Sequence, residues 1–460
     1  MENALKNKLM EIVGKNNFSD SIADVISASY DATSYRERPI GVVWPVSAKQ
    51  VSDIMKLANE YSFPVTPRGA GTGLAGAAVP ARASLSMDMC RMNKIIEINI
   101  PDRRTVVQPG VVYADLDYSL KKYGFFFPPD PSSSQVCTIG GNVATNAGGL
   151  RGAKYGTTKD YVMALEVVLA DGRIMRTGSS CIKSASGYDL ARLFAGSEGT
   201  LGIITEITLK ILPAPKFTAT GMAYFYSVED AGRAVASITS EGIIPSALEI
   251  FDSRTIRILR EHGKNIPPSN AMLLIETDGA SVLETSSQMS HIKKLLKKNT
   301  ASETYIARDE KEAAELWELR RSVSGIVSSI RPANFSEDIT VPISKMPEAL
   351  AGIERILEPY DLIFAIYGHA GDGNLHPKIV FDPEIVSQKE AVEKVIPEIF
   401  ALACSLNGTL TGEHGIGIAK AEFMGLEHDA VSLEMMQSIK NVFDPGNILN
   451  PGKMGLKPRQ

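Results

Sequence analysis

The chain of 460 residues is poor in cysteine and has no excess of basic side chains. Its four cysteines, Cys90, Cys137, Cys181 and Cys404, are widely spaced and form no C-x-x-C pair. This spacing excludes an iron–sulfur cluster of the usual kind held by the chain alone, and it fits a reducing compartment. The formal net charge of −5 argues against a nucleic-acid partner, which normally requires a basic face.

Long apolar runs are also missing. No run approaches the roughly 18 residues that are needed to cross a bilayer. The stretch Met1–Gly14 has the pattern of a polar amphipathic helix rather than of a signal peptide. We therefore expect a cytoplasmic protein that reaches a membrane, if at all, through a partner.

A chain of this length exceeds what one hydrophobic core usually supports, so two domains are expected. The run Leu212-Pro213-Ala214-Pro215 has the composition of a linker between them. Before it, Ser47–Ser62 has helical spacing, with Ser47 and Gln50 placed as a capping box. Strands are expected before the linker at 83–89, 95–98, 105–111 and 162–170. Beyond the linker they are expected at 218–226, 248–251, 272–277 and 303–306. These later strands alternate with helices, which is typical of an α+β fold.

Gly71, Gly73 and Gly76 satisfy the G-x-G-x-x-G pattern of a Rossmann nucleotide site. That motif should open a helix, whereas here Pro80 follows closely and the chain continues into a β-like run. What remains is a segment, Pro67–Leu74, that exposes successive backbone N–H groups, as a pyrophosphate cradle requires. The alternative is a tight surface loop.

A second glycine-rich stretch, 138–149, adds more bare backbone and the amide side chains of Asn142 and Asn146. One such stretch favours a surface loop. Two in one domain indicate a binding site for an extended dinucleotide.

Four segments, 67–80, 128–133, 138–149 and 196–202, resemble the FAD-binding segments of the vanillyl-alcohol oxidase/PCMH flavoprotein superfamily, in register over most of 36–213. The resemblance implies a PCMH-type FAD-binding domain, with the isoalloxazine ring between it and an α+β cap. Some members tether the flavin through a histidine in the first loop, where this chain has Thr72, so noncovalent FAD is expected. The residues expected to bind it are Pro67, Arg68, Gly69, Ala70, Gly71, Thr72, Gly73, Leu74, Pro131, Ser132, Thr138, Gly140, Gly141, Asn142, Thr145, Asn146, Gly148, Gly149, Glu198, Gly199, Gly202, Ile204 and Asn450.

Three of the six histidines lie in two short motifs, 368–376 and 412–417. The apolar runs 362–367 and 378–381 are predicted strands, and 370–374 is the turn between them. Folding back at this turn can bring His369 and His376 together, and Glu413 would complete a three-ligand site with open positions, suited to Zn²⁺ or Mn²⁺. The alternative is a hairpin of satisfied core histidines, with Glu413 and His414 capping a glycine loop.

These motifs resemble the glycolate oxidase/D-lactate dehydrogenase/D-2-hydroxyglutarate dehydrogenase branch of that superfamily, over nearly the whole chain. The resemblance implies that His369, His376 and Glu413 hold a metal and that His414 is the base beside the substrate. It further implies that Arg320 binds the substrate carboxylate, although a solvated helix charge is the alternative. The domains that it implies are an N-terminal segment 1–35, the FAD domain 36–215, the cap 216–442 and a tail 443–460 returning to the flavin.

Lys378 could contact the acid group, whereas 335–338 lacks the lysine that 2-hydroxyglutarate-specific relatives offer to a second carboxylate. We therefore expect metal-assisted oxidation of D-lactate or glycolate to the 2-oxo acid, with hydride transfer to flavin N5. Three alternatives remain: a D-2-hydroxyglutarate dehydrogenase, a noncatalytic flavin-binding component of a glycolate oxidase complex, and a flavin-dependent ether-lipid synthase. The resemblance implies an iron–sulfur protein or an electron-transfer flavoprotein as acceptor, and a homodimer is compatible with it.

Overall fold

The computed structural model describes residues 3–456, and the chain divides into two compact units. Unit 1 contains the described residues up to 148, then 157–214 and those from 413 onward. Unit 2 contains 149–156 and 215–412. Residues 413–442 were expected to belong to the cap, but they are grouped with unit 1. No helix within 3–456 combines the length and the apolarity needed to span a membrane.

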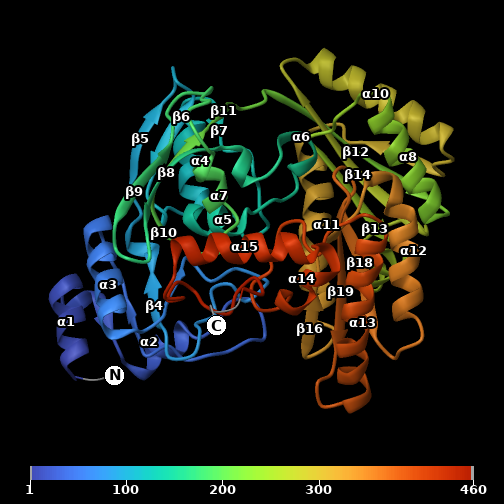
Figure 1. The fold of residues 1–460 in the computed structure, drawn as a ribbon. Coiled ribbons are helices and arrows are strands. Elements are labelled where there is room, and N and C mark those ends of the chain that lie inside the picture. The colour runs from blue at the N-terminus through green and yellow to red at the C-terminus, as the bar shows by residue number, and fades with distance from the viewer. Residues whose placement is uncertain (1–2, 457–460) are drawn as a thin grey trace. The chain divides into compact units, whose positions relative to one another are not determined.

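Unit 1 begins with a small sheet in the order β1 (Phe18–Ser19), β2 (Gly41–Val43), β4 (Leu85–Asp88), β3 (Val65–Arg68). Strands β2, β4 and β3 are parallel. Strand β4 is labelled in Figure 1. Helix α1 (Asn3–Val13) confirms the predicted N-terminal helix. Strand β3 overlaps the start of the glycine-rich segment 67–74 and was not among the predicted strands, because a four-residue strand containing Pro67 shows little pattern of its own.

Helix α3 (Ala48–Tyr61) confirms the helix predicted over 47–62. Ser47 Oγ accepts a hydrogen bond from Gln50 N, as an N-cap should. Only half of the expected capping box forms, because Gln50 Oε1 accepts from Val46 N instead of closing back on Ser47. The apolar face of α3 is buried in a core with α1 and the first sheet.

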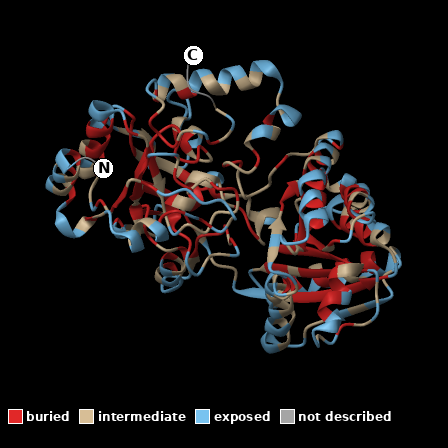
Figure 2. Cartoon of the chain, turned by 90° about the horizontal axis from the view of Figure 1, so that it is seen from below, coloured by how far each residue is buried: buried red, intermediate tan, exposed pale blue. Residues whose placement is uncertain are grey.

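The second sheet of unit 1 is antiparallel, in the order β5 (Ile95–Asn99), β6 (Arg104–Val107), β10 (Ile203–Lys210), β8 (Val162–Val168), β9 (Ile174–Gly178). It shares a core with α4 (Tyr113–Lys121) and α7 (Leu190–Phe194). The predicted strands are confirmed here, with shifted ends. In Figure 2 the buried residues of the unit gather on these strands and on the inner faces of the helices.

The second glycine-rich stretch is not the bare loop that was expected, since residues Ile139–Thr145 form helix α5. Thr138 is its N-cap, and its Oγ1 accepts a hydrogen bond from Gly141 N at 3.3 Å. A Cβ at Gly140 would overlap Pro109. Gly140 therefore allows the first turn of the helix to pack closely against Pro109, a purpose that composition alone does not distinguish from a loop.

Unit 2 is built on one antiparallel sheet in the order β15 (Glu303–Ile306), β12 (Phe217–Phe225), β14 (Ala271–Gly279), β13 (Ala247–Asp252), β18 (Ile363–His369), β19 (Asn374–Phe381), β16 (Ala333–Ser336), with β17 (Ile339–Thr340) also paired to β19. Helices α9 (Ser253–Glu261) and α11 (Glu310–Ser328) share a core with one face of the sheet. Helices α8 (Val228–Ser240) and α10 (Val282–Lys298) contact the sheet directly, and α12 (Met346–Leu357) packs on α8 and on α13 (Val386–Ser405). This confirms the expected α+β arrangement.

Strands β18 and β19 form the predicted hairpin. Tyr367 pairs with His376 and His369 pairs with Asn374 in its register. The turn needs Gly373, whose φ is +82° and where a Cβ would overlap the carbonyl of Val341. The register sets His369 and His376 diagonally across the two strands, on the same face of the sheet.

The C-terminal segment of unit 1 contains α14 (Met424–Glu427), α15 (Ala430–Phe443) and a tail rich in turn-forming residues. The tail is held in place: Val65 N donates to Ile448 O at 2.7 Å, and Asn450 N donates to Val65 O at 2.9 Å. Buried Lys440 pairs with Asp444 and donates to the carbonyls of Thr200 and Leu449. Residues 444–450 are therefore fixed against the rest of unit 1.

Candidate functional site

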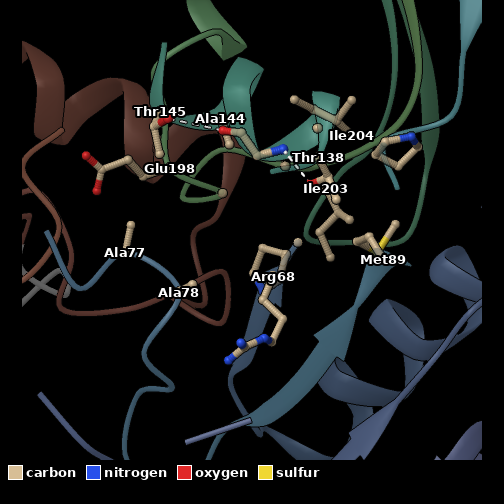
Figure 3. Close-up of a pocket in the computed structure, with 17 residues that line it drawn as sticks. Arg68, Ala77, Ala78, Met89, Thr138, Ala144, Thr145, Glu198, Ile203 and Ile204 are labelled. Carbon is tan, nitrogen blue, oxygen red and sulfur yellow. Dashed lines mark hydrogen bonds between the residues drawn. The ribbon is translucent and has the colours of Figure 1, made fainter. Parts of the chain in front are cut away.

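A cleft in unit 1 lies between the loop after β3, helix α5 and the segment 198–204. It consists of two adjoining cavities that share lining residues, among them Gly69, Thr138 and Gly141. Figure 3 shows the first cavity, with Arg68 and Ala78 on one side and Ala144 and Ile203 on another. The cleft is thus long and is bordered by two glycine-rich segments that are distant in the sequence.

Close packing explains why glycine is needed along this cleft. A Cβ at Gly69 would overlap Thr138 Oγ1. Gly199 has a φ of +72°, and a Cβ there would approach Pro67 Cγ at 2.5 Å. Backbone therefore forms much of the lining, which leaves N–H groups and flat apolar surface for a ligand.

Most residues predicted to bind FAD line one of the two cavities; the exceptions are Asn146, Gly149 and Asn450. Asn146 accepts a hydrogen bond from Lys159 N, and Gly149 belongs to unit 2. Asn450 acts from behind the cleft, since its Nδ2 donates to the carbonyls of Ala77 and Glu198. The glycine and polar motifs in the sequence did not identify several apolar residues that line the cleft. These are Ala77, Ala78, Met89, Pro109, Ala144 and Ile203.

Glu198 joins the cleft to the loop that contains His414. Its backbone is left-handed, with a φ of +52°, and its side chain is buried. Its two carboxylate oxygens accept hydrogen bonds from Ile416 N at 2.7 Å and Gly417 N at 2.8 Å. Burial raises the pKa of Glu198 to about 7, against the opposing effect of these amides and of two buried lysines.

Glu413 and His414 line the second cavity of unit 1, together with residues of both glycine-rich segments. The Glu413 side chain lies close to Gly148, where a Cβ would be only 3.2 Å from it, so the missing side chain leaves room for Glu413. The structure therefore puts the proposed base and the first glycine loop around one cavity.

In unit 2, the hairpin brings His369 and His376 together. Their Nε2 atoms lie 3.3 Å apart, and the ring planes are nearly perpendicular, at 84°. Both side chains are buried. The two imidazoles therefore point their Nε2 atoms at one place, as ligands of a shared ion do.

Glu249 on β13 contacts this pair and also Arg320 on α11. Its Oε1 lies 2.6 Å from His369 Nδ1, and its Oε2 accepts from Arg320 Nε at 2.5 Å. Burial opposes ionisation of Glu249, but attraction to Arg320 and His369 outweighs it, and the pKa of Glu249 is lowered. Arg320, with 11% of its side chain exposed, also lies over the Tyr367 ring, so the alternative of a solvated helix charge is wrong.

Lys378 is two residues beyond His376 on β19, on the same face of the strand. It is buried, and its Nζ donates to Ser324 Oγ on α11 at 2.8 Å. Burial lowers the pKa of Lys378 to about 8. Arg320 and Lys378 thus place two cationic groups near the histidine pair.

Unit 2 also fixes the chain immediately before Glu413. Gly412 N donates to both the carbonyl and the carboxylate of buried Asp338, and Thr411 Oγ1 donates to the same carboxylate at 3.0 Å. Asp338 is the last residue of the segment 335–338, and its buried carboxylate accepts hydrogen bonds from the Thr411 hydroxyl and the Gly412 amide.

Comparisons with known proteins identify the family of the chain. The family described as FAD linked oxidases, C-terminal domain, matches residues 214–454, and the one described as FAD binding domain matches 39–178. The chain is 42% identical to the glycolate oxidase subunit GlcD of Bacillus subtilis, over 98% of this chain and 97% of that protein. It is 33% identical to the mitochondrial D-lactate dehydrogenase [cytochrome] of Arabidopsis thaliana, over 94% and 78%. Among solved structures, p-cresol methylhydroxylase shares the fold with a TM-score of 0.83, at 17% identity and with 99% and 97% covered.

The chain therefore belongs to the FAD-linked oxidases of the vanillyl-alcohol oxidase/PCMH superfamily. Within that superfamily it falls in the glycolate oxidase/D-lactate dehydrogenase branch, and it is an FAD-linked oxidoreductase. Both parts of the resemblance seen in the sequence are confirmed. This kinship supports FAD-linked oxidation of a small hydroxy acid.

Proposed function

We propose that this protein oxidises a small D-2-hydroxy acid, D-lactate or glycolate, to the 2-oxo acid. The observation that carries the proposal is the convergence of the His369 and His376 Nε2 atoms, 3.3 Å apart, in the same unit as the cations Arg320 and Lys378. A hydroxy acid needs both kinds of group, because it offers a hydroxyl that must be deprotonated and a carboxylate that must be held. FAD, when bound, supplies the acceptor for the hydride that leaves C2.

The glycine-lined cleft of unit 1 fits FAD. Its backbone lining leaves room that a Cβ would fill at Gly69 and Gly199. The first glycine segment offers no histidine side chain, which supports noncovalent attachment.

His369, His376 and Glu413 would hold a divalent ion, Zn²⁺ or Mn²⁺. The donor set is two imidazole nitrogens and one carboxylate oxygen, which leaves positions open for a substrate. Its support is the Nε2 convergence and the anchoring of Gly412, to which Glu413 is covalently bonded, on Asp338 in the same unit as the histidines. When bound, such an ion supplies a Lewis acid that favours the alkoxide form of the substrate hydroxyl.

Three side chains of the protein then have defined tasks. Arg320 binds the substrate carboxylate, for which a planar guanidinium is well suited. Lys378 contacts the same acid group as a second cation. His414 accepts the hydroxyl proton, since histidine is the side chain that exchanges protons near neutral pH.

The segment 335–338 favours a monocarboxylate. Its two acidic residues, Glu337 and Asp338, are buried, and the Asp338 carboxylate already accepts hydrogen bonds from the Thr411 hydroxyl and the Gly412 amide. The segment contains no cation that could hold a second carboxylate. This supports D-lactate or glycolate over D-2-hydroxyglutarate.

The direct test is an anaerobic titration of the purified yellow protein with D-lactate, L-lactate, glycolate and D-2-hydroxyglutarate, followed by flavin absorbance. We expect rapid bleaching by D-lactate or glycolate and little by L-lactate. Bleaching by D-2-hydroxyglutarate alone would establish the dicarboxylate alternative. If none of the acids bleaches the flavin, the proposal is wrong, and a noncatalytic flavin-binding component or a non-redox synthase becomes the better assignment.

We also propose that electrons leave through a separate protein, an iron–sulfur protein or an electron-transfer flavoprotein. The four cysteines of this chain are widely spaced in the sequence and form no C-x-x-C pair, so their spacing is not that of an iron–sulfur cluster that could receive electrons. With D-lactate we expect slow turnover in air and fast turnover with dichlorophenolindophenol. Hydrogen peroxide formed at the dye-coupled rate would show instead that the chain is a self-sufficient oxidase.

A further inference from the structure

Glu249 is a fully buried carboxylate in the middle of the unit 2 sheet. It lies on β13 directly opposite His369 on the neighbouring strand β18. Its exposed fraction is 0%, and a carboxylate removed from water costs free energy unless hydrogen bonds and opposite charge satisfy its oxygens. The hydrogen-bond partners of the Glu249 carboxylate therefore indicate why a charged side chain occupies this position.

The two oxygens of Glu249 contact two different functional side chains. Oε1 lies 2.6 Å from His369 Nδ1, and Oε2 accepts from Arg320 Nε at 2.5 Å. An ionised carboxylate can only accept hydrogen bonds, so His369 must carry its proton on Nδ1. Its Nε2 atom, which lies 3.3 Å from His376 Nε2, then presents a lone pair.

We propose that Glu249 is a positioning residue for both halves of the substrate site. Through Oε1 it sets the His369 tautomer that can bind a metal, and through Oε2 it sets the orientation of the guanidinium that binds the substrate carboxylate. The inference rests on the proposed function and adds to it that one side chain couples metal affinity to hydroxy-acid affinity.

A glutamine at this position would fail for a specific reason. Its side chain has one accepting oxygen and one donating NH₂ group, while both His369 Nδ1–H and Arg320 Nε–H are donors. One of the two contacts becomes donor against donor, or His369 moves its proton to Nε2, where it blocks metal binding. Aspartate keeps the charge, but it is shorter by one methylene and cannot reach both partners in their present positions.

The chain offers a matched control in Glu276, on the adjacent strand β14. Its carboxylate accepts from Trp317 Nε1 at 2.8 Å, and Trp317 lies on α11 three residues before Arg320. Both glutamates therefore attach α11 to the sheet, but no contact joins Glu276 to the histidine pair among the hydrogen bonds of the described residues. Glu276→Gln removes the charge of this second buried carboxylate but keeps an accepting oxygen for Trp317, so an effect due only to losing a buried charge beside α11 would appear in both variants.

The experiment uses the FAD-loaded full chain, stripped of metal by a chelator. Mn²⁺ is titrated into the wild type, Glu249→Gln, Glu249→Asp, Glu276→Gln and Arg320→Lys, with free Mn²⁺ measured by electron paramagnetic resonance. KM for D-lactate is measured at saturating Mn²⁺. Retained flavin and an unchanged far-ultraviolet circular dichroism spectrum establish that each variant is folded.

We expect Glu249→Gln to weaken Mn²⁺ affinity by about 10- to 100-fold, the usual effect of losing the hydrogen-bond partner of a metal ligand, and to raise KM as well. Arg320→Lys should raise KM alone, and Glu276→Gln should change neither the Mn²⁺ affinity nor KM.

If Glu249→Gln does not fold, Glu249→Asp is the test variant, and it must lose affinity for Mn²⁺, for D-lactate or for both. Equal Mn²⁺ loss in Glu249→Gln and Glu276→Gln, or unchanged values in the folded Glu249 variants, would overturn the inference. A wild type that neither binds Mn²⁺ nor is reduced by D-lactate would instead refute the proposed function.

Discussion

The Nε2 atoms of His369 and His376 lie 3.3 Å apart although seven positions separate the two residues in the sequence. In one extended strand an odd spacing places side chains on opposite faces. The hairpin removes this difficulty, because His369 pairs with Asn374 and His376 is its diagonal neighbour on the same face. The closeness of the imidazoles is thus a consequence of the turn.

This pair leads to the first prediction, that His376→Ala abolishes reduction of the flavin by D-lactate while FAD stays bound. We expect a loss greater than about 10²-fold, since even an outer partner of a metal ligand is typically worth about 10- to 100-fold. Anaerobic single-turnover absorbance measures it. His291→Ala, which changes an exposed histidine on α10, is the control and should retain full activity. Full activity in a chelator-stripped wild type would contradict the metal assignment.

The second prediction concerns how FAD is held. Thr72 lines the second cavity, at the place where some relatives have a tethering histidine, and segment 67–80 contains no histidine. Acid precipitation should therefore release all of the flavin into the supernatant, where its absorbance is measured. A washed pellet that remains yellow would show a covalent link.

The third prediction is that His414→Asn slows flavin reduction by roughly 10²- to 10⁴-fold, the usual scale for losing a general base. His414 lines the second cavity with the first glycine loop, so asparagine keeps polarity there but cannot take up a proton. Stopped-flow absorbance with excess D-lactate gives the rate. His428→Asn, fourteen residues on and paired with Glu427, should leave the rate unchanged. A wild-type rate in His414→Asn would remove this residue from the mechanism.

The fourth prediction is a pH dependence of stability due to Glu198. Its pKa is raised from 4.5 to about 7 by burial, so the folded protein binds this proton more tightly than the unfolded chain. The stabilising effect is complete below about pH 4.5 and is lost as pH rises through 7, a change of about 3 kcal/mol in the free energy of unfolding.

Glu198→Gln, which has no proton to lose, isolates this effect. Relative to the variant, the wild type should become progressively less stable between pH 5 and pH 8, as measured by thermal unfolding of the FAD-loaded proteins. A wild-type minus variant difference that is constant over this range would show that the Glu198 carboxyl is already ionised at pH 5.

The fold could be predicted largely from local patterns, and the exceptions have identifiable causes. Apolar patterns located most strands of the two large sheets but not β9, β16 or β17, and Ser47 located the start of α3. Glycine content was misleading at 138–149, because Gly140 serves the close packing of helix α5 on Pro109 and not an open loop. Strand β3 was missed because its four residues, which include Pro67, are too few to show a periodic pattern.

The sequence by itself determined the chemistry that is available: two glycine-rich segments, a histidine hairpin, a Glu-His pair and no cysteine cluster. These are local features, and composition and spacing over a few residues are enough to identify them. Only the tertiary structure decided that Arg320 is buried against Glu249, that Glu198 holds the amides of 416 and 417, and that the tail is fixed beside Val65. Each of these contacts joins residues far apart in the chain, and a buried charge does not select its partner until the sheets and helices that carry both groups have packed together.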